Sequence, residues 1–238
     1  MPVYFNKIRL FPSALFLFFL ISGCGENESS TEKKTETQTT QANEAPENST
    51  KKGVVLFFGN SLTAGYGVDS EESFPALIQA RIDSLGLPYT VVNAGVSGET
   101  TATGLNRIDW VLDRQDITVF VLELGANDGL RGLPPEQTRA NLEAIISRVR
   151  KAQPSAEIIL AGMMVPPSMG PEYSKKYNRI YPEIANAKDV DLIPFLLQNV
   201  GGIDSLNQDD GIHPNLAGNK IVVENVWPIL SEKLREKK

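Results

Sequence analysis

The chain has very little cysteine and histidine, with one residue of each in 238. A single cysteine excludes a disulfide within the chain, and with only one histidine beside it a zinc site of the usual His/Cys kind is excluded too. The chain also lacks a block of basic residues, and its formal net charge is −6. An acidic chain of this kind is a poor candidate for binding nucleic acid.

The N-terminal region has the features of a secretory signal. Lys7 and Arg9 precede an apolar run over residues 10–21, which is too short to span a bilayer. The run ends in ISGC, which resembles the bacterial lipobox, where cleavage precedes a cysteine that then carries lipid. We therefore expect a signal peptide over residues 1–23 and a lipid on Cys24, which would anchor the protein in the cell envelope, facing the periplasm or the exterior. A plain signal peptide with an incidental cysteine is the alternative.

Residues 24–52 separate this anchor from the rest of the chain. After the cysteine, the segment has no aromatic and no large aliphatic side chain. Such a composition buries too little surface to offset the entropy lost on ordering, so we expect a disordered tether. Residues 53–238 have the length of one domain with a sizeable core.

Short apolar runs alternate with amphipathic segments in this domain. The runs predict strands over residues 54–58, 89–92, 117–124, 157–161 and 190–193. The amphipathic segments predict helices over residues 73–84, 101–112, 135–151, 172–186 and 214–236. The runs are continuously apolar, which is typical of strands buried on both faces of a parallel sheet. The pattern predicts a doubly wound α/β domain, in which ligands bind beyond the carboxyl ends of the strands.

The only histidine lies in the motif DGIHPN, over residues 210–215. Neutral imidazole is the usual base for activating a hydroxyl near pH 7, and it needs a carboxylate to fix its tautomer. Asp210 precedes His213 by three residues, across a glycine that lets the chain fold back. The two are a candidate base and carboxylate. The alternative is an Asp-Gly turn before a helix that has Pro214 at its first position.

Three further motifs follow the first three predicted strands. GNSLTAGYG, over residues 59–67, places Ser61 in an exposed loop near a helix N-terminus, which favours negative charge. NAGVSGETT, over residues 93–101, has glycines that allow close approach of a ligand to the backbone. GANDGL, over residues 125–130, places Asn127 where its amide can donate to an oxyanion. Taken singly, each motif is also explained as a helix cap, a phosphate loop or a turn.

In this order and spacing, the four motifs resemble the four blocks of the GDSL/SGNH hydrolases. The resemblance covers residues 54–230, and within the superfamily it is strongest to the bacterial arylesterases and to the acyl-CoA thioesterase/lysophospholipase branch. It implies an α/β fold, a flavodoxin-like three-layer sandwich with a five-stranded parallel sheet. It also implies a serine esterase that uses no cofactor and no metal.

The resemblance assigns a role to each motif. Ser61 would be the nucleophile and His213 the general base, oriented by Asp210. The oxyanion would be bound by the N–H groups of Ser61 and Gly98 and by the side-chain amide of Asn127.

Two details qualify this assignment. Asn60 stands where the family's name has aspartate, and it keeps the shape and a carbonyl acceptor but loses the charge. We expect this change to affect loop rigidity or pH dependence rather than the roles of Ser61 and His213. We also expect His213 to stand at the N-terminus of the last helix, whose dipole would keep the imidazole neutral.

The expected reaction is hydrolysis of aryl or acyl esters through an acyl-enzyme. Outside the cytoplasm acyl-CoA should be scarce, so lysophospholipids or other carboxylic esters are better candidate substrates than thioesters. For the acyl pocket we expect Leu130 and the loop over residues 165–173, with Pro167 and Met169 as contacts.

Two other functions are compatible with parts of the sequence. A flavin- or phosphate-binding module would suit the hydroxyl-rich first loop, but it leaves Asp210, His213 and Asn127 unexplained. A non-catalytic surface lipoprotein that binds acyl chains or glycans is the second alternative, and the intact serine, histidine and aspartate argue against it.

Overall fold

The computed structural model describes residues 53–235. The predicted signal peptide, Cys24 and the tether lie outside the described residues. The described chain contains a sheet of five parallel strands in the order β2-β1-β3-β4-β5. The strands are β1 (Gly53–Gly59), β2 (Tyr89–Gly95), β3 (Val119–Glu123), β4 (Glu157–Ala161) and β5 (Asp191–Ile193). This is the flavodoxin-like order, and it confirms the predicted α/β fold with five parallel strands.

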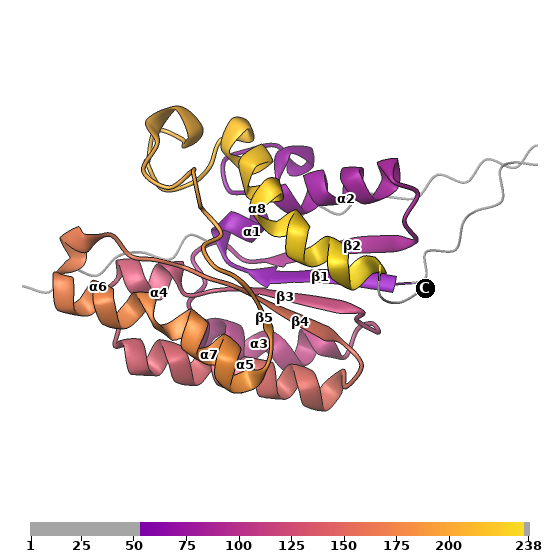
Figure 1. The fold of residues 1–238 in the computed structure, drawn as a ribbon, viewed down its shortest axis with the longest axis horizontal. Helices are drawn as coiled ribbons and strands as arrows, with labels where there is room; N and C mark the ends of the chain where they lie inside the picture. The colour runs from indigo at the N-terminus through magenta and orange to yellow at the C-terminus, as the bar shows by residue number, and fades with distance from the viewer. Residues whose placement is uncertain (1–52, 236–238) are drawn as a thin grey trace, which may run out of the picture. The chain divides into compact units, whose positions relative to one another are not determined.

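Helices cover both faces of the sheet (Figure 1). The helices α2 (Phe74–Ser84) and α8 (Leu216–Arg235) pack together on one face. The other face carries α3 (Thr101–Leu112), α5 (Pro135–Ala152), α6 (Pro171–Asn178) and α7 (Ile180–Lys188). Right-handed crossovers require this division, because the chain moves towards one edge of the sheet after β1 and towards the other after β2. The strand order therefore reverses between β1 and β3.

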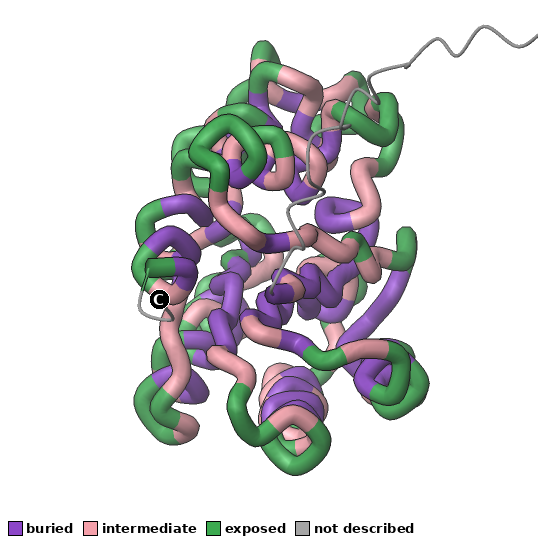
Figure 2. The backbone as a smooth tube through the Cα atoms, turned by 90° about the vertical axis from the view of Figure 1, so that its right-hand side faces the viewer, coloured by how far each residue is buried: buried purple, intermediate pink, exposed green. Residues whose placement is uncertain are grey.

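The core explains why the strands read as continuous apolar runs. Val55, Leu56, Phe57 and Phe58 of β1 are all fully buried, so side chains on both faces of this strand are covered by helices. Figure 2 shows buried backbone in the middle of the domain and exposed backbone at its periphery. Among the described residues, no helix has the length and apolar character needed to cross a membrane.

Two helix predictions were wrong in part. The helix expected over residues 172–186 is two helices, α6 and α7, that meet at Arg179. Pro182 causes the break, because it lacks the N–H that would bond the carbonyl of Asn178. The last helix begins at Leu216 rather than at Pro214, which pairs with Asn207 in an isolated bridge.

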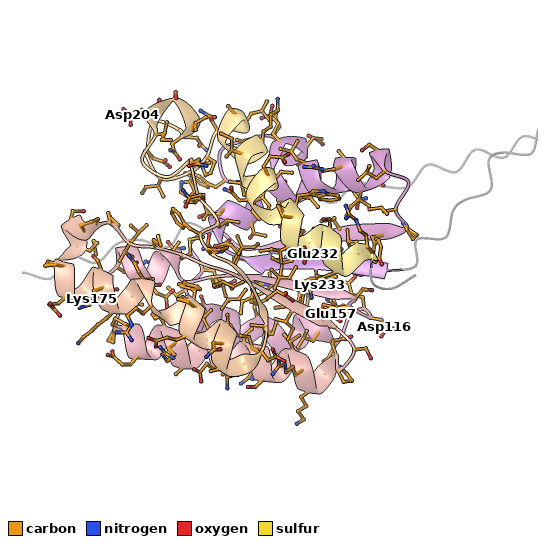
Figure 3. All side chains as sticks on the ribbon, in the orientation of Figure 1. Asp116, Glu157, Lys175, Asp204, Glu232 and Lys233 are labelled. Atoms are coloured by element: carbon orange, nitrogen blue, oxygen red, sulfur yellow. The ribbon has the colours of Figure 1, made fainter. Side chains whose placement is uncertain are left out.

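The carboxyl ends of the strands lie together at one end of the sheet. Asp116 and Glu157 lie at the amino-terminal edge, whereas Lys175 and Asp204 lie on segments beyond the carboxyl ends of the strands (Figure 3). At the carboxyl edge, Gly59 of β1 pairs with Gly95 of β2. The same glycine pairs with Glu123 of β3, so the three strands end level with one another. The loops that follow them are thereby brought together.

Candidate active site

Ser61 is the first residue of a short helix, α1 (Ser61–Ala64), that begins directly after β1. The side chain of Asn60 caps this helix by accepting from the N–H of Leu62 at 2.9 Å. Gly65 ends it in the left-handed conformation, with φ of 76°. The sequence suggested an exposed loop for Ser61, but the residue is only 9% exposed. The short, capped turn therefore holds the hydroxyl in a fixed and largely buried position.

The neighbouring strand approaches this turn closely. A Cβ atom at Gly95 would meet the backbone of Ala64, so only glycine fits at the end of β2. Asn93 of the same strand donates from Nδ2 to the carbonyl of Thr63 at 2.8 Å. These contacts fix α1 against the loop that carries Gly98.

The structure brings Ser61, His213 and Asp210 into one hydrogen-bonded chain. Nε2 of His213 lies 2.8 Å from Oγ of Ser61. Nδ1 of the same ring lies 2.6 Å from Oδ2 of Asp210. With Nδ1 facing a carboxylate, the proton of the neutral ring sits on Nδ1 and leaves Nε2 free to accept from the serine. This is the geometry that activates a hydroxyl as a nucleophile.

Both carboxylate oxygens of Asp210 take part in hydrogen bonds, Oδ2 with the ring of His213 and Oδ1 with backbone N–H groups. The Oδ1 atom accepts from the N–H groups of Ile212 at 2.9 Å and His213 at 3.0 Å. Hydrogen bonds from the backbone and the ring of His213 lower the pKa of Asp210 to about 2. Asp210 is therefore ionised at any pH at which His213 acts as a base.

His213 does not stand at the start of a helix, which corrects the prediction from sequence. It lies three residues before α8, in the turn that ends at the Asn207–Pro214 bridge. A helix dipole falls off within a turn, so the contacts of the ring with Asp210 and Tyr66 define its surroundings instead. The ring of Tyr66 lies 4.7 Å from that of His213, centroid to centroid.

Two of the three predicted oxyanion donors, Gly98 and Asn127, line the same cavity as Ser61. Gly98 has a φ of 81°, a left-handed conformation that favours glycine, and lines the same cavity as Ser61. Asn127 lies on the short helix α4 (Ala126–Leu130), directly after β3, and lines this cavity as well. Nδ2 of Asn127 donates to the carbonyl of Glu99 at 3.0 Å. An amide nitrogen carries two protons, so a second one remains for a ligand.

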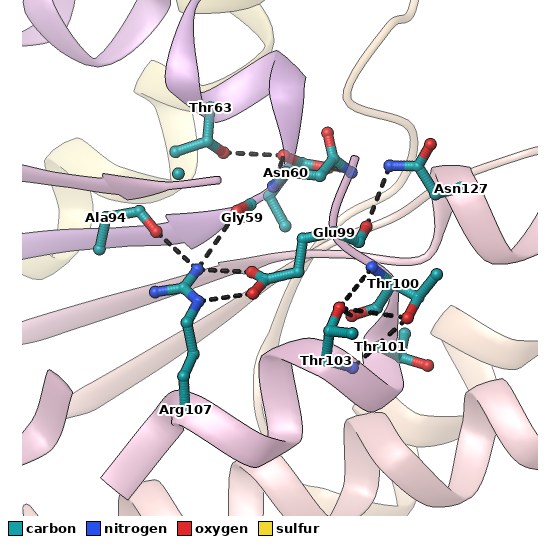
Figure 4. Close-up of polar contacts among 12 residues, drawn as sticks. Gly59, Asn60, Thr63, Ala94, Glu99, Thr100, Thr101, Thr103, Arg107 and Asn127 are labelled. Atoms are coloured by element: carbon teal, nitrogen blue, oxygen red, sulfur yellow. Dashed lines mark hydrogen bonds and ion pairs between the residues drawn. The ribbon is translucent and has the colours of Figure 1, made fainter. Parts of the chain in front are cut away.

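An ion pair between the partly exposed Arg107 and the buried Glu99 joins these loops to the sheet (Figure 4). Arg107 of α3 binds Glu99 in a bidentate manner, with Nε 2.6 Å from Oε1 and Nη2 2.5 Å from Oε2. Nη2 also donates to the carbonyl of Ala94 at 2.8 Å and lies 3.5 Å from that of Gly59. One guanidinium thus contacts the ends of β1 and β2 and the loop of Gly98.

Three tyrosines support the segment that carries Asn127. The hydroxyls of Tyr177 and Tyr181 donate to the carbonyls of Gly125 and Leu124 at 2.5 and 2.8 Å. Tyr173 donates to the carbonyl of Leu133 at 2.8 Å. These side chains come from α6 and α7, so these two helices hold the segment after β3 in place.

A cavity of about 690 Å³ opens beside Ser61 and His213. Its walls are mainly apolar and come from the loops after β3, β4 and β5: Leu130, Met163, Met164, Val165, Pro166, Pro167, Phe195, Leu197 and Ile212. The lining contains no Lys, Arg, Asp or Glu among the described residues. A site of this kind accepts an apolar group and orients it with a few polar atoms.

The sequence identified only part of this cavity. Leu130 and Pro167 line it as expected, whereas Met169 does not and packs against the core instead. Phe195 and Leu197 lie within the stretch that resembles the family, but nothing in their local sequence, just after a three-residue strand, predicts that they line a cavity. Tyr66 lies within the GNSLTAGYG motif, and its place beside a predicted nucleophile could have identified it. Glu99 lies inside the NAGVSGETT motif but no role was predicted for it, and Arg107 of α3 carries no sequence signal of its own.

The titratable residues of the site do not form a metal centre. Within residues 53–235, no group of three or more His, Cys, Asp or Glu side chains lies close enough together to hold a metal ion. His213 uses both ring nitrogens in the contacts to Ser61 and Asp210.

Comparison with known proteins gives one consistent result. A model of the GDSL-like Lipase/Acylhydrolase family matches residues 57–221. Esterase TesA of Pseudomonas aeruginosa is 40% identical over 74% of this chain and 87% of that protein. Thioesterase 1/protease 1/lysophospholipase L1 of Escherichia coli is 38% identical over 68% of this chain and 75% of that protein. A crystal structure of TesA, 39% identical, superposes with a TM-score of 0.72 and covers 76% of this chain and 99% of that one.

Proposed function

The chain belongs to the GDSL-like lipase/acylhydrolase family and is a serine ester hydrolase, and we propose that it hydrolyses carboxylic esters with an uncharged, apolar acyl or aryl group through an acyl-enzyme on Ser61. The observation that carries the proposal is the 2.8 Å contact between Oγ of Ser61 and Nε2 of His213 at the mouth of an apolar cavity.

The proposed reaction uses the site as follows. Oγ of Ser61 attacks the ester carbonyl carbon while its proton passes to Nε2 of His213, and Asp210 stabilises the resulting imidazolium. The carbonyl oxygen becomes an oxyanion, bound by the N–H groups of Ser61 and Gly98 and the amide of Asn127. Collapse breaks the bond to the alcohol, which takes the proton from Nε2. Water then repeats the sequence on the acyl-enzyme and releases the acid.

The cavity supports the choice of substrate class. Its walls offer apolar contacts and no fixed charge, so binding energy comes from burial of an alkyl or aryl group. A phosphate, as in coenzyme A or a lysophospholipid headgroup, has no cationic partner in this lining. Such substrates would have to keep their charged part in solvent, and we therefore propose simple esters as the better substrates.

The two alternative functions are not favoured. A phosphate-binding loop would need the turn at Ser61 to present free donors to a ligand, whereas the serine hydroxyl is paired with His213. A non-catalytic binding protein has no need of the chain from Ser61 to Asp210. Neither function accounts for both the triad and the cavity.

For location, we propose a lipid on Cys24 and an envelope lipoprotein. Support comes from the basic residues, the short apolar run and the ISGC motif in the sequence. Cells that express Cys24→Ser should fail to incorporate labelled palmitate into the protein and should release it or retain an uncleaved precursor. Incorporation of palmitate into the variant at the wild-type level would contradict the proposal.

A substrate panel tests the proposed activity. The purified domain should be assayed with p-nitrophenyl esters of graded chain length, a lysophospholipid and an acyl-CoA under the same conditions. We expect kcat/KM to be highest for an uncharged ester with an apolar acyl chain. A higher kcat/KM for the lysophospholipid or the acyl-CoA would contradict the proposed preference.

A further inference from the structure

A buried carboxylate lies directly behind the nucleophile and has no part in the proposed triad. Glu123 is the last residue of β3 and is fully buried. It pairs in register with Gly59, two residues before Ser61. A buried acid at this position requires partners, because an unpaired carboxylate inside a protein is costly.

All the hydrogen-bond partners of the Glu123 carboxylate come from the turn that carries Ser61. Oε1 accepts from Nδ2 of Asn60 at 2.8 Å. Oε2 accepts from the backbone N–H of Asn60 at 3.1 Å and from the hydroxyl of Thr63 at 2.8 Å. The carboxylate therefore holds the residues on both sides of the nucleophile.

Asn60 transmits this arrangement to the serine. With Nδ2 engaged by Glu123, its Oδ1 atom is directed to the N–H of Leu62 at 2.9 Å and lies 3.5 Å from Oγ of Ser61. The amide has one donor side and one acceptor side, and both are used. An aspartate at position 60 could make the same contacts only while protonated, because two carboxylates at this separation repel each other.

We propose that Glu123 and Asn60 are positioning residues for Ser61. The side-chain amide of Asn60 donates its hydrogen bond to Glu123 at every pH, whereas an acid at position 60 would donate one only while it holds a proton. The inference rests on the proposed function, because its main measure is ester hydrolysis. It predicts that the identity of residue 60 sets the alkaline limit of activity.

The surroundings of Glu123 move its titration into the neutral pH range. Burial raises the pKa of Glu123 to about 7, although hydrogen bonds from Thr63 and Asn60 act against the shift. The titratable and charged groups on the neighbouring elements are the hydroxyl of Tyr181 on α7 and the ion pair of Arg107 with Glu99 behind Gly59. None of them neutralises the carboxylate, so a second acid beside it would bind a proton tightly.

The test exchanges the side-chain amide of Asn60 and the carboxyl group of Glu123, singly and together. Asn60→Asp places two carboxyls together, and Glu123→Gln makes two amides face each other. The double variant Asn60→Asp/Glu123→Gln reverses the pair and satisfies every contact, because the amide introduced at position 123 would donate to the acid at position 60 and still accept from Thr63 and the backbone. Asn186→Asp makes the same chemical change at an exposed position of α7 and is the control.

The measurement is kcat/KM from about pH 6 to about pH 9.5, relative to wild type at each pH. We expect Asn60→Asp to stay within about threefold of wild type below pH 7 and to fall at least about tenfold by pH 9, as the shared proton is lost. Glu123→Gln should lose about tenfold or more at pH 9 and approach wild type near pH 6, where Glu123 is itself protonated. The double variant should stay within about threefold throughout, and Asn186→Asp should match wild type.

The outcomes separate this inference from the proposed function. An inactive wild-type protein would contradict the proposed function, whereas an active one with an Asn60→Asp profile parallel to its own would overturn the inference. A double variant no better than the worse single variant would also overturn it. Thermal unfolding at both ends of the range provides a measure independent of activity. Asn60→Asp should lose more stability than wild type at high pH and the double variant should not. Losses in Asn60→Asp and the double variant that are equal would overturn the inference even if a single variant folds too poorly to assay.

Discussion

Nδ2 of Asn127 on α4 donates to the backbone carbonyl of Glu99, in the loop before α3, across 3.0 Å. The side chain of the same Glu99 is bound by Arg107, which also reaches the carbonyls at the ends of β1 and β2. Asn127, the loop of Gly98 and the ends of β1 and β2 are therefore joined by one connected set of hydrogen bonds at the carboxyl end of the sheet. Their arrangement is set before a substrate arrives.

Ser61→Ala should abolish ester hydrolysis and preserve the fold. The variant removes the attacking oxygen, and we expect kcat to fall by about 10⁴-fold or more, with only the effects of the oxyanion donors and binding left. The free energy of unfolding should change by about 1 kcal/mol or less, since the serine hydroxyl has one short hydrogen bond, to His213, and one long contact of 3.5 Å to Oδ1 of Asn60. Activity and denaturant unfolding should be measured on the same preparation. A folded variant that keeps most of its activity would exclude Ser61 as the nucleophile.

Arg107→Lys should lower kcat more than it raises KM. A lysine keeps the charge but cannot bind Glu99 in a bidentate manner or hold the carbonyl of Ala94 at the same time. We expect kcat to fall by about tenfold, the size of one weakened oxyanion contact, with KM nearly unchanged. Steady-state kinetics with one ester are sufficient to see this.

A second variant separates positioning from stability. Arg107→Met leaves the buried Glu99 unpaired and should destabilise the fold by about 3–5 kcal/mol, whereas Arg107→Met/Glu99→Gln should recover most of that loss. If Arg107→Lys changed only KM, the ion pair would have no role in holding the oxyanion donors.

Much of the fold could be predicted because its determinants are local. The run Val55–Phe58 is buried on both faces, and that burial is what makes the sequence continuously apolar. Ser61, Asp210, His213, Gly98 and Asn127 stand in motifs with turn residues, so their spacing is visible in the chain. Pro182 stands between α6 and most of α7, and although this proline is visible in the sequence, the predicted helix over residues 172–186 runs through it.

The rest depends on contacts between distant segments. Glu123 looks like the polar end of a strand, and its importance comes from Asn60 and Thr63, which are about 60 residues away in sequence. Phe195 belongs to the cavity only because the sheet places the end of β5 near that of β4. Met169 packs against the core rather than lining the cavity, and the turn residues around it do not predict which way its side chain points.

Stability should depend on pH through Glu123. Its folded pKa, raised to about 7 by burial, exceeds its usual value of 4.5, so folding favours the protonated acid. A raised pKa gives a contribution that is fully present below about pH 4.5 and is lost as the pH rises through about 7, which amounts to about 3 kcal/mol. Glu123→Gln has no proton to lose, so its free energy of unfolding should decline less than that of wild type between pH 5 and pH 8. Denaturant titrations at the two pH values measure this, and equal declines would place the pKa of Glu123 near its ordinary value.

The acyl chain should run along Leu130. This residue is 44% exposed, follows Asn127 on α4 and lines the cavity beside Ser61. Leu130→Trp fills part of that space, so long acyl groups should lose more binding than short ones, on the scale of about 1–3 kcal/mol per methylene that apolar pockets show. The ratio of kcat/KM for decanoyl over acetyl p-nitrophenyl esters should therefore fall by about ten- to a hundredfold. Met169→Phe is the matched control, because Met169 packs against the core outside the cavity and its enlargement should leave the ratio unchanged. An unchanged ratio in Leu130→Trp, or an equal fall in Met169→Phe, would place the acyl chain elsewhere.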